Sequence, residues 1–297
     1  MDSPYEKAFF AILLLEATIG SLSSFLLIVS LILKEFRKKN IGTYSRILIP
    51  LNMSNICYSI ILSLNFDTNF LSPKLYGNVS VHHTITYMTM YSITSYMWLS
   101  AVLCVFYFMK IVSSQPGVLT TLKSRMGAVV MWLIITSEVV SLGGSFLSMV
   151  PLRPQTDQRN SSISLSEVTS GTSTQKAFVT NVLILNSLPF LVIIMTTIGS
   201  AGFLKLYNHQ IQKSMKTSGS TRVKDYRAAI YTMIGLLALY VTILLCSILI
   251  VLGVFSHLPL GYCLCVIFLF LCATSLPALL IYGNPVLKEA IKQIFTC

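Results

Sequence analysis

The sequence predicts an all-α fold, a bundle of seven transmembrane helices with the N-terminus outside the cell and the C-terminus in the cytoplasm. The first observation is composition: 54% of the 297 residues are hydrophobic and only 10% are charged, whereas about a quarter of the residues in a soluble domain are charged. The second is a series of long apolar stretches, and the third is an uneven distribution of Lys and Arg between them. A soluble fold with a mean hydropathy of +0.75 would expose large apolar patches, which monomers avoid, and the aliphatic content excludes disorder.

Each apolar stretch is long enough to cross a hydrocarbon core of about 30 Å as a helix. Inside a bilayer the backbone must satisfy its own hydrogen bonds, so helix is the expected structure of every stretch. The expected spans are residues 8–33, 47–66, 84–109, 126–150, 178–204, 228–252 and 261–282. We expect residues 1–297 to form a single domain around these spans, with a short cytoplasmic tail at 283–297.

The individual spans have features that fit membrane helices. The first follows Asp2 and Glu6 instead of a positively charged region, so we expect it to act as its own insertion signal and not as a cleaved signal peptide. The second span contains Pro50, the fifth Pro189 and the seventh Pro277. Prolines are tolerated in a membrane bundle because neighbouring groups satisfy the carbonyls that a kink frees.

The basic residues predict the orientation. Sixteen of the 21 Lys and Arg residues lie in the segments 34–46, 110–125, 205–227 and 283–297. Cytoplasmic loops carry the excess of Lys and Arg, so these segments are expected inside the cell. An outside N-terminus and an inside C-terminus require an odd number of crossings, in agreement with seven. The sequons that begin at Asn78 and Asn160 fall in segments assigned to the outside, and we expect both residues to be glycosylated.

The cysteines do not suggest an extracellular disulfide. None of the seven lies in an outer loop, and all but Cys297 lie inside spans, where they are expected to act as small apolar side chains. The bridge between the third helix and the second outer loop that many receptors have is therefore unavailable. This outer loop, at 151–177, is rich in Ser and Thr, and we expect it to be mobile.

The sequence offers little support for catalysis or transport. All four His residues lie in loops or at span ends, so no cluster at bilayer depth supplies metal ligands or a catalytic base. We expect no enzyme activity, no metal and no cofactor. The Gly143-Gly144-Ser145 string is expected to allow close helix packing. The chain shows no internal repeat of the kind found in transporters, which leaves a transporter or channel as a weaker alternative.

Two acidic residues, Glu16 and Glu138, lie inside the first and fourth spans, where a charge is costly. No basic residue lies inside any span to pair with them. Two interpretations remain open: a neutral carboxyl that hydrogen-bonds to neighbours such as Ser141, and a counter-charge for a cationic ligand.

Four short strings carry a family resemblance: FYFMKI (106–111), LPF (188–190), STRV (220–223) and LIYGNPVLKEA (280–290). They resemble the FYxLKI, LPF, STKV and LILGNPKLKQA strings of the bitter-taste (type 2 taste) receptors, in the same order and spacing. Seven helices, basic inner loops and no catalytic set also lead by elimination to the architecture of a G-protein-coupled receptor. A vomeronasal type 1-like chemoreceptor is the nearest alternative.

The chain departs from the family pattern at several positions. Ser24 and Asn55 stand where the family usually has Asn and Arg, and Leu276 stands where it has His. Thr89 and Ile93 replace a frequent Trp and Asn on the third helix. The sequence therefore resembles a divergent member, and the family's pocket chemistry does not transfer to it.

A ligand cavity is expected in the outer half of the bundle, between the third, fifth, sixth and seventh spans. Its third-span residues recur at spacings of three and four, and Tyr240 falls where the resemblance implies a ligand-responsive tyrosine. The expected ligand-binding residues are Phe66, Thr86, Thr89, Met90, Ile93, Thr94, Met97, Thr180, Asn181, Leu185, Tyr240, Cys263, Val266 and Phe270. Such an apolar lining with a few hydroxyls and amides suits small amphipathic molecules, which the resemblance implies are bitter compounds. The alternative is that these residues only pack helix against helix.

The inner face is expected to bind a heterotrimeric G protein when the sixth span moves outward. The expected contact residues are Tyr107, Lys110, Ile111, Lys123, Lys213, Lys216, Arg222 and Lys288. Their positive charge would attract the carboxylate-bearing end of an α subunit, although membrane topology and anionic lipid account for the same charge. The resemblance implies a gustducin-like partner of the inhibitory class. We also expect contact with membrane lipid, sterol included, no nucleic-acid partner, and a multi-pass location in the plasma membrane.

Polar residues of the second span lie on one helix face: Asn52, Asn55 and Ser59. With Ser24 and Ser275 they are expected to form a buried polar cluster, which acts either as a conformational switch or as simple interhelical glue.

Overall fold

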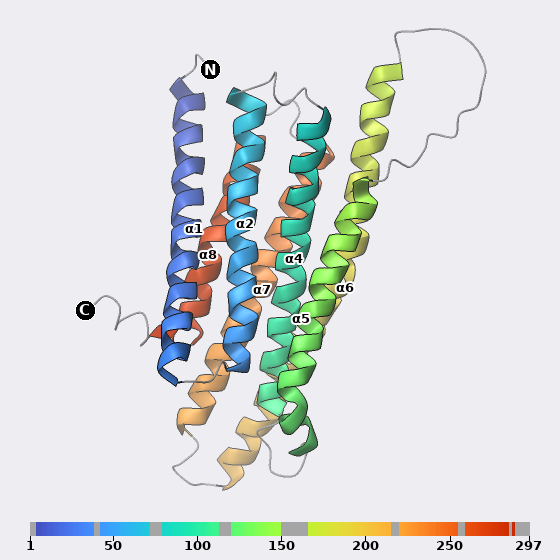
Figure 1. The fold of residues 1–297 in the computed structure, drawn as a ribbon. Coiled ribbons are helices and arrows are strands. Elements are labelled where there is room, and N and C mark those ends of the chain that lie inside the picture. Colours follow the sequence, from blue (N-terminus) through green and yellow to red (C-terminus); the bar gives the residue numbers. More distant parts are fainter. Residues whose placement is uncertain are drawn as a thin grey trace, which may run out of the picture.

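The computed structural model describes residues 4–38, 42–71, 79–112, 120–149, 166–214, 220–254, 259–284 and 287–288. In these ranges the chain forms seven long helices: α1 (Pro4–Lys38), α2 (Thr43–Leu71), α4 (Val79–Val112), α5 (Thr120–Met149), α6 (Ser166–Ser214), α7 (Ser220–Val251) and α8 (Pro259–Tyr282). Each contains a segment long and apolar enough to cross a membrane, so the seven predicted spans are confirmed. The first residues of α1 and the last of α8 lie at opposite ends of the bundle (Figure 1).

The helices form a bundle around α4. This helix packs against α2, α5, α6 and α7, while α1 packs against α2 and α8, and α7 against α6 and α8 (Figure 1). The most apolar part of α4 is 67% buried, whereas the corresponding part of α5 is only 17% buried. α4 is therefore the core of the bundle, and α5 lies at its rim.

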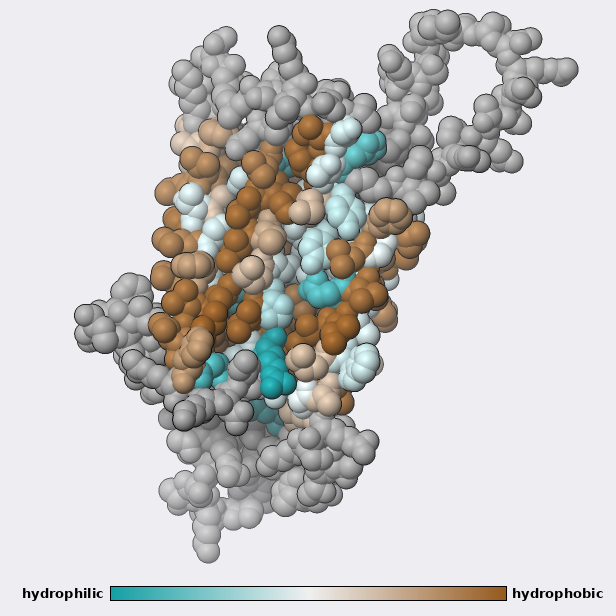
Figure 2. Space-filling model, in the orientation of Figure 1, coloured by the Kyte–Doolittle hydropathy of each residue, from teal (hydrophilic) through white to brown (hydrophobic). Residues whose placement is uncertain are grey.

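The outer surface of the bundle is apolar. Leu15, Phe25, Trp132, Phe146 and Met195 each expose more than half of their surface. Figure 2 shows hydrophobic side chains over most of the described part of this face, with few hydrophilic ones between them. Such a surface would be costly in water and is favourable against lipid tails. The chain is a multi-pass membrane protein.

The structure differs from prediction at the start of the fifth membrane helix. We expected residues 151–177 to form a polar loop, but α6 already begins at Ser166. No proline stands between Ser166 and Pro189 to stop the helix. Pro50, Pro189 and Pro277 lie inside α2, α6 and α8, as predicted.

A buried polar contact joins three helices. The Asn55 side-chain amide of α2 donates to the Ser24 hydroxyl of α1 and to the Ala273 backbone carbonyl of α8, each at 2.9 Å. Of the five residues of the predicted polar cluster, Ser24 and Asn55 thus contact each other. Ser275 and Asn52 instead donate to carbonyls of their own helices, because hydroxyl and amide side chains in a helix can reach the preceding turn.

The predicted close packing by small residues occurs at Gly144. A side chain at that position would place its Cβ 2.6 Å from the Leu185 Cδ2 of α6. The neighbouring Gly143 faces open space instead. Gly144 therefore allows α5 and α6 to approach, and Gly143 does not take part.

The cysteines within the described ranges are free thiols inside helices, as predicted: Cys57, Cys104, Cys246, Cys263, Cys265 and Cys272. Cys297 lies outside the described residues.

Candidate ligand site and cytoplasmic surface

The outer half of α4 contributes the largest group of expected ligand residues. Met90, Thr94 and Met97 are fully buried, and Ile93 packs against the same core. Thr89 is also buried, and its hydroxyl donates to a carbonyl of its own helix at 2.8 Å. This face of α4 points into the bundle, and the Thr89 hydroxyl is already satisfied within the helix.

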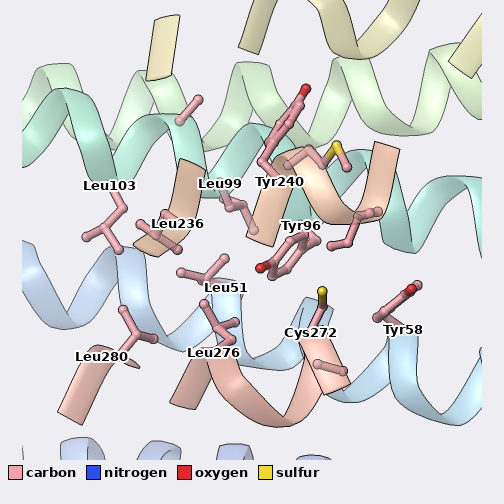
Figure 3. Close-up of a cluster of buried hydrophobic side chains, with 14 of the residues drawn as sticks. Leu51, Tyr58, Tyr96, Leu99, Leu103, Leu236, Tyr240, Cys272, Leu276 and Leu280 are labelled. Atoms are coloured by element: carbon pink, nitrogen blue, oxygen red, sulfur yellow. The ribbon is translucent and has the colours of Figure 1, made fainter. Parts of the chain in front are cut away.

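The partners of this face come from α7 and α8. Tyr240, Val266 and Phe270 are buried in the same hydrophobic cluster as Met97. Figure 3 shows Tyr240 beside Leu99, with its hydroxyl directed away from the labelled residues of α4. The structure thus brings the central residues of the predicted site together around Tyr240.

The Tyr240 hydroxyl links α7 to α6. It donates to the backbone carbonyl of Asn186. The Tyr240 and Phe190 rings stack, with centroids 5.3 Å apart and an interplanar angle of 20°. Stacking of this kind adds to area burial, so Tyr240 is held to α6 by both its ring and its hydroxyl.

Other expected ligand residues lie farther from this centre. Thr86 and Cys263 are half-buried, and Thr180 is exposed. The side chains of Phe66 and Asn181 lie outside the described residues.

Leu185 departs from the expectation that it lines a cavity facing α7 and α8. Its side chain lies against Gly144 of α5, because the missing Cβ at Gly144 leaves a space that the leucine fills. Leu185 therefore belongs to the α5–α6 contact.

Glu138 is held by α4. Its two carboxyl oxygens accept hydrogen bonds from the Tyr91 hydroxyl and the Ser95 hydroxyl, each at 2.8 Å. The expected partner Ser141 donates instead to the Ser137 carbonyl of its own helix. The carboxyl thus bridges α5 and α4 at the rim of the bundle, which favours the interpretation of a hydrogen-bonded structural group over a ligand counter-charge.

Glu16 lies partly buried on α1, which packs against α2 and α8. One of its carboxyl oxygens is buried and has no hydrogen-bond partner among the described residues. The structure thus leaves both interpretations of this residue open.

At the cytoplasmic end, two expected G-protein contacts are hidden. Tyr107 and Ile111 are buried at 4% and 1% exposure. The Tyr107 hydroxyl lies 3.1 Å from the Tyr44 hydroxyl of α2, and Tyr44 also hydrogen-bonds to the Asn284 side chain at the end of α8. Tyr107 was expected at the surface but is buried, because its ring packs with the rings of Tyr44 and Phe106.

Basic residues surround this closed end. Lys110 and Lys288 are exposed, as are Arg46, Lys205 and Arg227 on α2, α6 and α7. The side chains of the remaining expected contacts and both glycosylation candidates lie outside the described residues: Lys123, Lys213, Lys216, Arg222, Asn78 and Asn160.

A carboxylate of α1 caps the start of α2. Glu35 accepts from the Gly42 backbone amide at 3.0 Å and from the Ser45 hydroxyl at 2.6 Å. A negative charge at a helix N-terminus satisfies free amides and complements the helix dipole. This contact sets where α2 begins, and hence where Tyr44 lies.

Several of these residues were missed in the sequence. Tyr91 and Ser95 are four apart, a spacing that puts both hydroxyls on one helix face and could have indicated a partner for Glu138. Phe190 belongs to the LPF string, but nothing in the sequence pairs it with Tyr240. Nothing in the sequence indicated the contact between Tyr44 and Tyr107, because the two residues are distant in the chain.

Comparison with known proteins supports the resemblance. The family model described as taste receptor protein (TAS2R) matches residues 1–297. The chain is similar to taste receptor type 2 member 40 of Gallus gallus, 23% identical over 99% of this chain and 96% of that protein. It is also similar to taste receptor type 2 member 8 of Pongo pygmaeus, 26% identical over 100% of this chain and 98% of that protein.

Proposed function

Because the chain belongs to the taste receptor type 2 family, a class of G-protein-coupled receptors for bitter taste, we propose that it binds small amphipathic bitter compounds between α4, α6, α7 and α8 and activates a heterotrimeric G protein at its cytoplasmic end. The family match favours this function over a vomeronasal type 1-like chemoreceptor and over a transporter or channel. The matched family is a receptor family and is not known as a family of enzymes.

The position of Tyr240 is the observation that carries the proposal. It is buried at the meeting point of the expected ligand residues and hydrogen-bonds to α6. Suppose that α7 has two arrangements and that a ligand contacts Tyr240 better in one of them. The ligand then shifts the equilibrium toward that arrangement, and only such a difference in contact can shift it.

The ligand side of the proposal rests on the chemistry of the lining. The proposed lining is the inward face of α4 together with residues of α7 and α8: Thr86, Thr89, Met90, Ile93, Thr94, Met97, Tyr240, Cys263, Val266 and Phe270. Exposed Thr180 of α6 is also proposed to contact the ligand, and Leu185 is left out because its side chain faces α5. Apolar groups with few free polar atoms hold ligands mainly by burial, which favours broad selectivity.

The partner side rests on charge and topology. Exposed basic side chains on α2, α4, α6 and α7 surround the end assigned to the cytoplasm and would attract an acidic helix of the α subunit. A gustducin-like protein of the inhibitory class is the proposed partner, in a plasma membrane whose lipids, sterol included, contact the apolar outer face. The whole chain acts as one seven-helix domain.

The test is a calcium or G-protein dissociation assay on the variant Tyr240→Ala at matched surface expression. Loss of the ring removes the contact between ligand and α7, and we expect maximal signalling to fall strongly. Tyr231→Ala is the matched control, since Tyr231 is an exposed tyrosine of the same helix. An undiminished maximum in the Tyr240 variant contradicts the proposed role.

A further inference from the structure

α7 and α8 pack side by side in opposite directions. Toward the inner end of the pair, Leu279 of α8 fills the space beside Gly235 of α7. Farther out, the Cys272 thiol of α8 lies 4.0 Å from the Leu239 backbone carbonyl of α7. The contacts therefore advance toward the C-terminus of α7 as they go back toward the N-terminus of α8, which sets the register of the two helices.

This register brings two further cysteines together. Cys246 follows Leu239 by seven residues, and Cys265 precedes Cys272 by seven. Seven residues make almost two helical turns, so each cysteine lies on the same helix face as the residue from which it is counted. The two thiol groups are close enough to interact electrostatically, and both belong to the same buried cluster.

Both thiols lie near the end of the bundle that is assigned to the outside of the cell. The apolar segment of α7 ends at Ile250 and that of α8 begins at Gly261, so each cysteine is about 6 Å from the end of its span. Each of the two side chains is only 6% exposed, so a reagent that reaches them must be small and uncharged. On this side of a membrane, thiols are oxidised more readily than in the cytoplasm.

We propose that Cys246 and Cys265 form a dithiol site that small uncharged disulfides oxidise, and that the product is an interhelical disulfide between α7 and α8. Both residues are free thiols in the structure, so the site is described in its reduced state. The proposal goes beyond the proposed function and does not depend on it.

Thiol–disulfide exchange accounts for every atom of the reaction. The Cys246 thiolate attacks one sulfur of the ligand R–S–S–R, forms a mixed disulfide and expels RS⁻, which takes up the proton that Cys246 has lost. The Cys265 thiolate then attacks the Sγ atom of Cys246 and expels the second RS⁻, which takes up the proton from Cys265. Two protein thiols are oxidised to one disulfide, and one ligand disulfide is reduced to two RSH. Exchange is faster when the leaving thiol is acidic, so aromatic disulfides are the preferred ligands.

The new bond would restrain two helices that carry expected ligand residues. Val266 follows Cys265 directly, and Tyr240 precedes Cys246 by less than two turns of α7. Both are buried in the same cluster as the two cysteines. A disulfide also restricts the unfolded chain, so the oxidised protein should unfold at a higher temperature than the reduced protein.

The first experiment detects the bond in the full chain. A protease site is inserted in the connection between α7 and α8, and the protein in nanodiscs is treated with dithiodipyridine, an uncharged aromatic disulfide. The remaining thiols are blocked with N-ethylmaleimide before the chain is cleaved and unfolded. Electrophoresis without reductant then shows whether the two fragments remain joined.

We expect the fragments to remain joined in the treated chain and to separate when a reductant is added. They should separate without reductant in Cys246→Ala and in Cys265→Ala. The matched control is Cys263→Ala, a change of a half-buried cysteine two residues away on α8, and its fragments should remain joined. Separate fragments in the treated chain with all its cysteines, or joined fragments in either of the first two variants, overturn the proposal.

The second experiment uses the chain without substitutions, so it does not depend on the folding of a variant. Mass spectrometry of the treated protein should show the peptides of Cys246 and Cys265 joined and without a pyridyl group, because the second exchange step expels it. The midpoint of thermal unfolding should rise with treatment and return after reduction. Pyridyl groups retained on both cysteines, or unreacted thiols at both, contradict the proposal whatever a G-protein assay gives.

Discussion

At the scale of single residues, Glu138 is a polar group that joins two helices at the rim of the bundle. Its carboxyl receives hydroxyl hydrogen bonds from two residues of α4, Tyr91 and Ser95. Interhelical hydrogen bonds in membrane proteins contribute about 0.6 kcal/mol each on average. Glu138 therefore positions α5 on α4 and adds modestly to stability.

We predict that Glu138→Ala lowers the free energy of unfolding by about 1 to 2 kcal/mol, because two hydroxyls lose their acceptor. Glu138→Gln retains an amide oxygen and should lose less than half of that. Thermal unfolding in detergent measures both, and Thr136→Ala is the control because its exposed hydroxyl donates only within α5.

The same variants separate the two interpretations of this carboxyl. If Glu138 is only a hydrogen-bonded structural group, agonist potency should be unchanged in Glu138→Gln at matched expression. A selective loss of response to cationic agonists in that variant would instead identify Glu138 as a counter-charge.

At the scale of helices, two contacts help to set the relative positions of neighbouring helices. Gly144 lets α5 approach α6, with Leu185 in the space a side chain would take. At the inner end, Tyr44 of α2 holds Tyr107 of α4. The contact at Gly144 affects the packing of α5 on α6. We expect the Tyr44–Tyr107 contact to keep Tyr107 buried.

We predict that Gly144→Ala destabilises the bundle by about 1 to 3 kcal/mol, because the new methyl group overpacks the site and Leu185 must move. Gly143→Ala is the matched control. Nothing lies near its Cβ position, so it should be neutral or slightly stabilising through better helix propensity. Equal effects of the two variants on the unfolding midpoint would refute the packing argument.

We predict that Tyr44→Phe raises basal nucleotide exchange by about two- to tenfold, since it removes one hydrogen bond that keeps Tyr107 buried. Tyr282→Phe, a change of an exposed tyrosine near the same end, should leave basal exchange unaltered. If both variants show the same basal exchange as the unmodified chain, burial of Tyr107 does not limit basal activation of the G protein.

The helices could be predicted from the sequence because their signal is local. A run of apolar residues at 84–109 is sufficient to place a span, and the segment of α4 that is apolar and long enough to cross a membrane runs from His83 to Val112. The contact of Ser24 with Asn55 was also within reach, because both stand among the polar residues of apolar spans that were expected to form one buried cluster. Tyr240 with Asn186, and Tyr44 with Tyr107, could not be predicted, since each pairing depends on how distant helices are rotated against one another.

At the scale of the whole molecule, orientation connects the fold to signalling. The basic residues are concentrated between alternate spans, and the ends of α1 and α8 lie at opposite ends of the bundle (Figure 1). Together these would put the proposed ligand site on one side of the membrane and the proposed partner surface on the other.

We predict that enzymatic deglycosylation increases the gel mobility of the expressed chain, through sugars on Asn78 and Asn160, and that variants lacking both sequons show no such shift. An epitope tag after Cys297 should bind antibody only once cells are permeabilised. Antibody binding on intact cells would reverse the assigned orientation.

Agonist-dependent nucleotide exchange by the purified chain is the most direct measurement of the central claim. The full chain, reconstituted in nanodiscs with an inhibitory-class heterotrimer, is exposed to a library of bitter compounds. We predict that several chemically different amphipathic compounds accelerate exchange, and that Tyr240→Ala abolishes the acceleration. Substrate flux through liposomes containing the chain, with no compound accelerating exchange, would contradict the account.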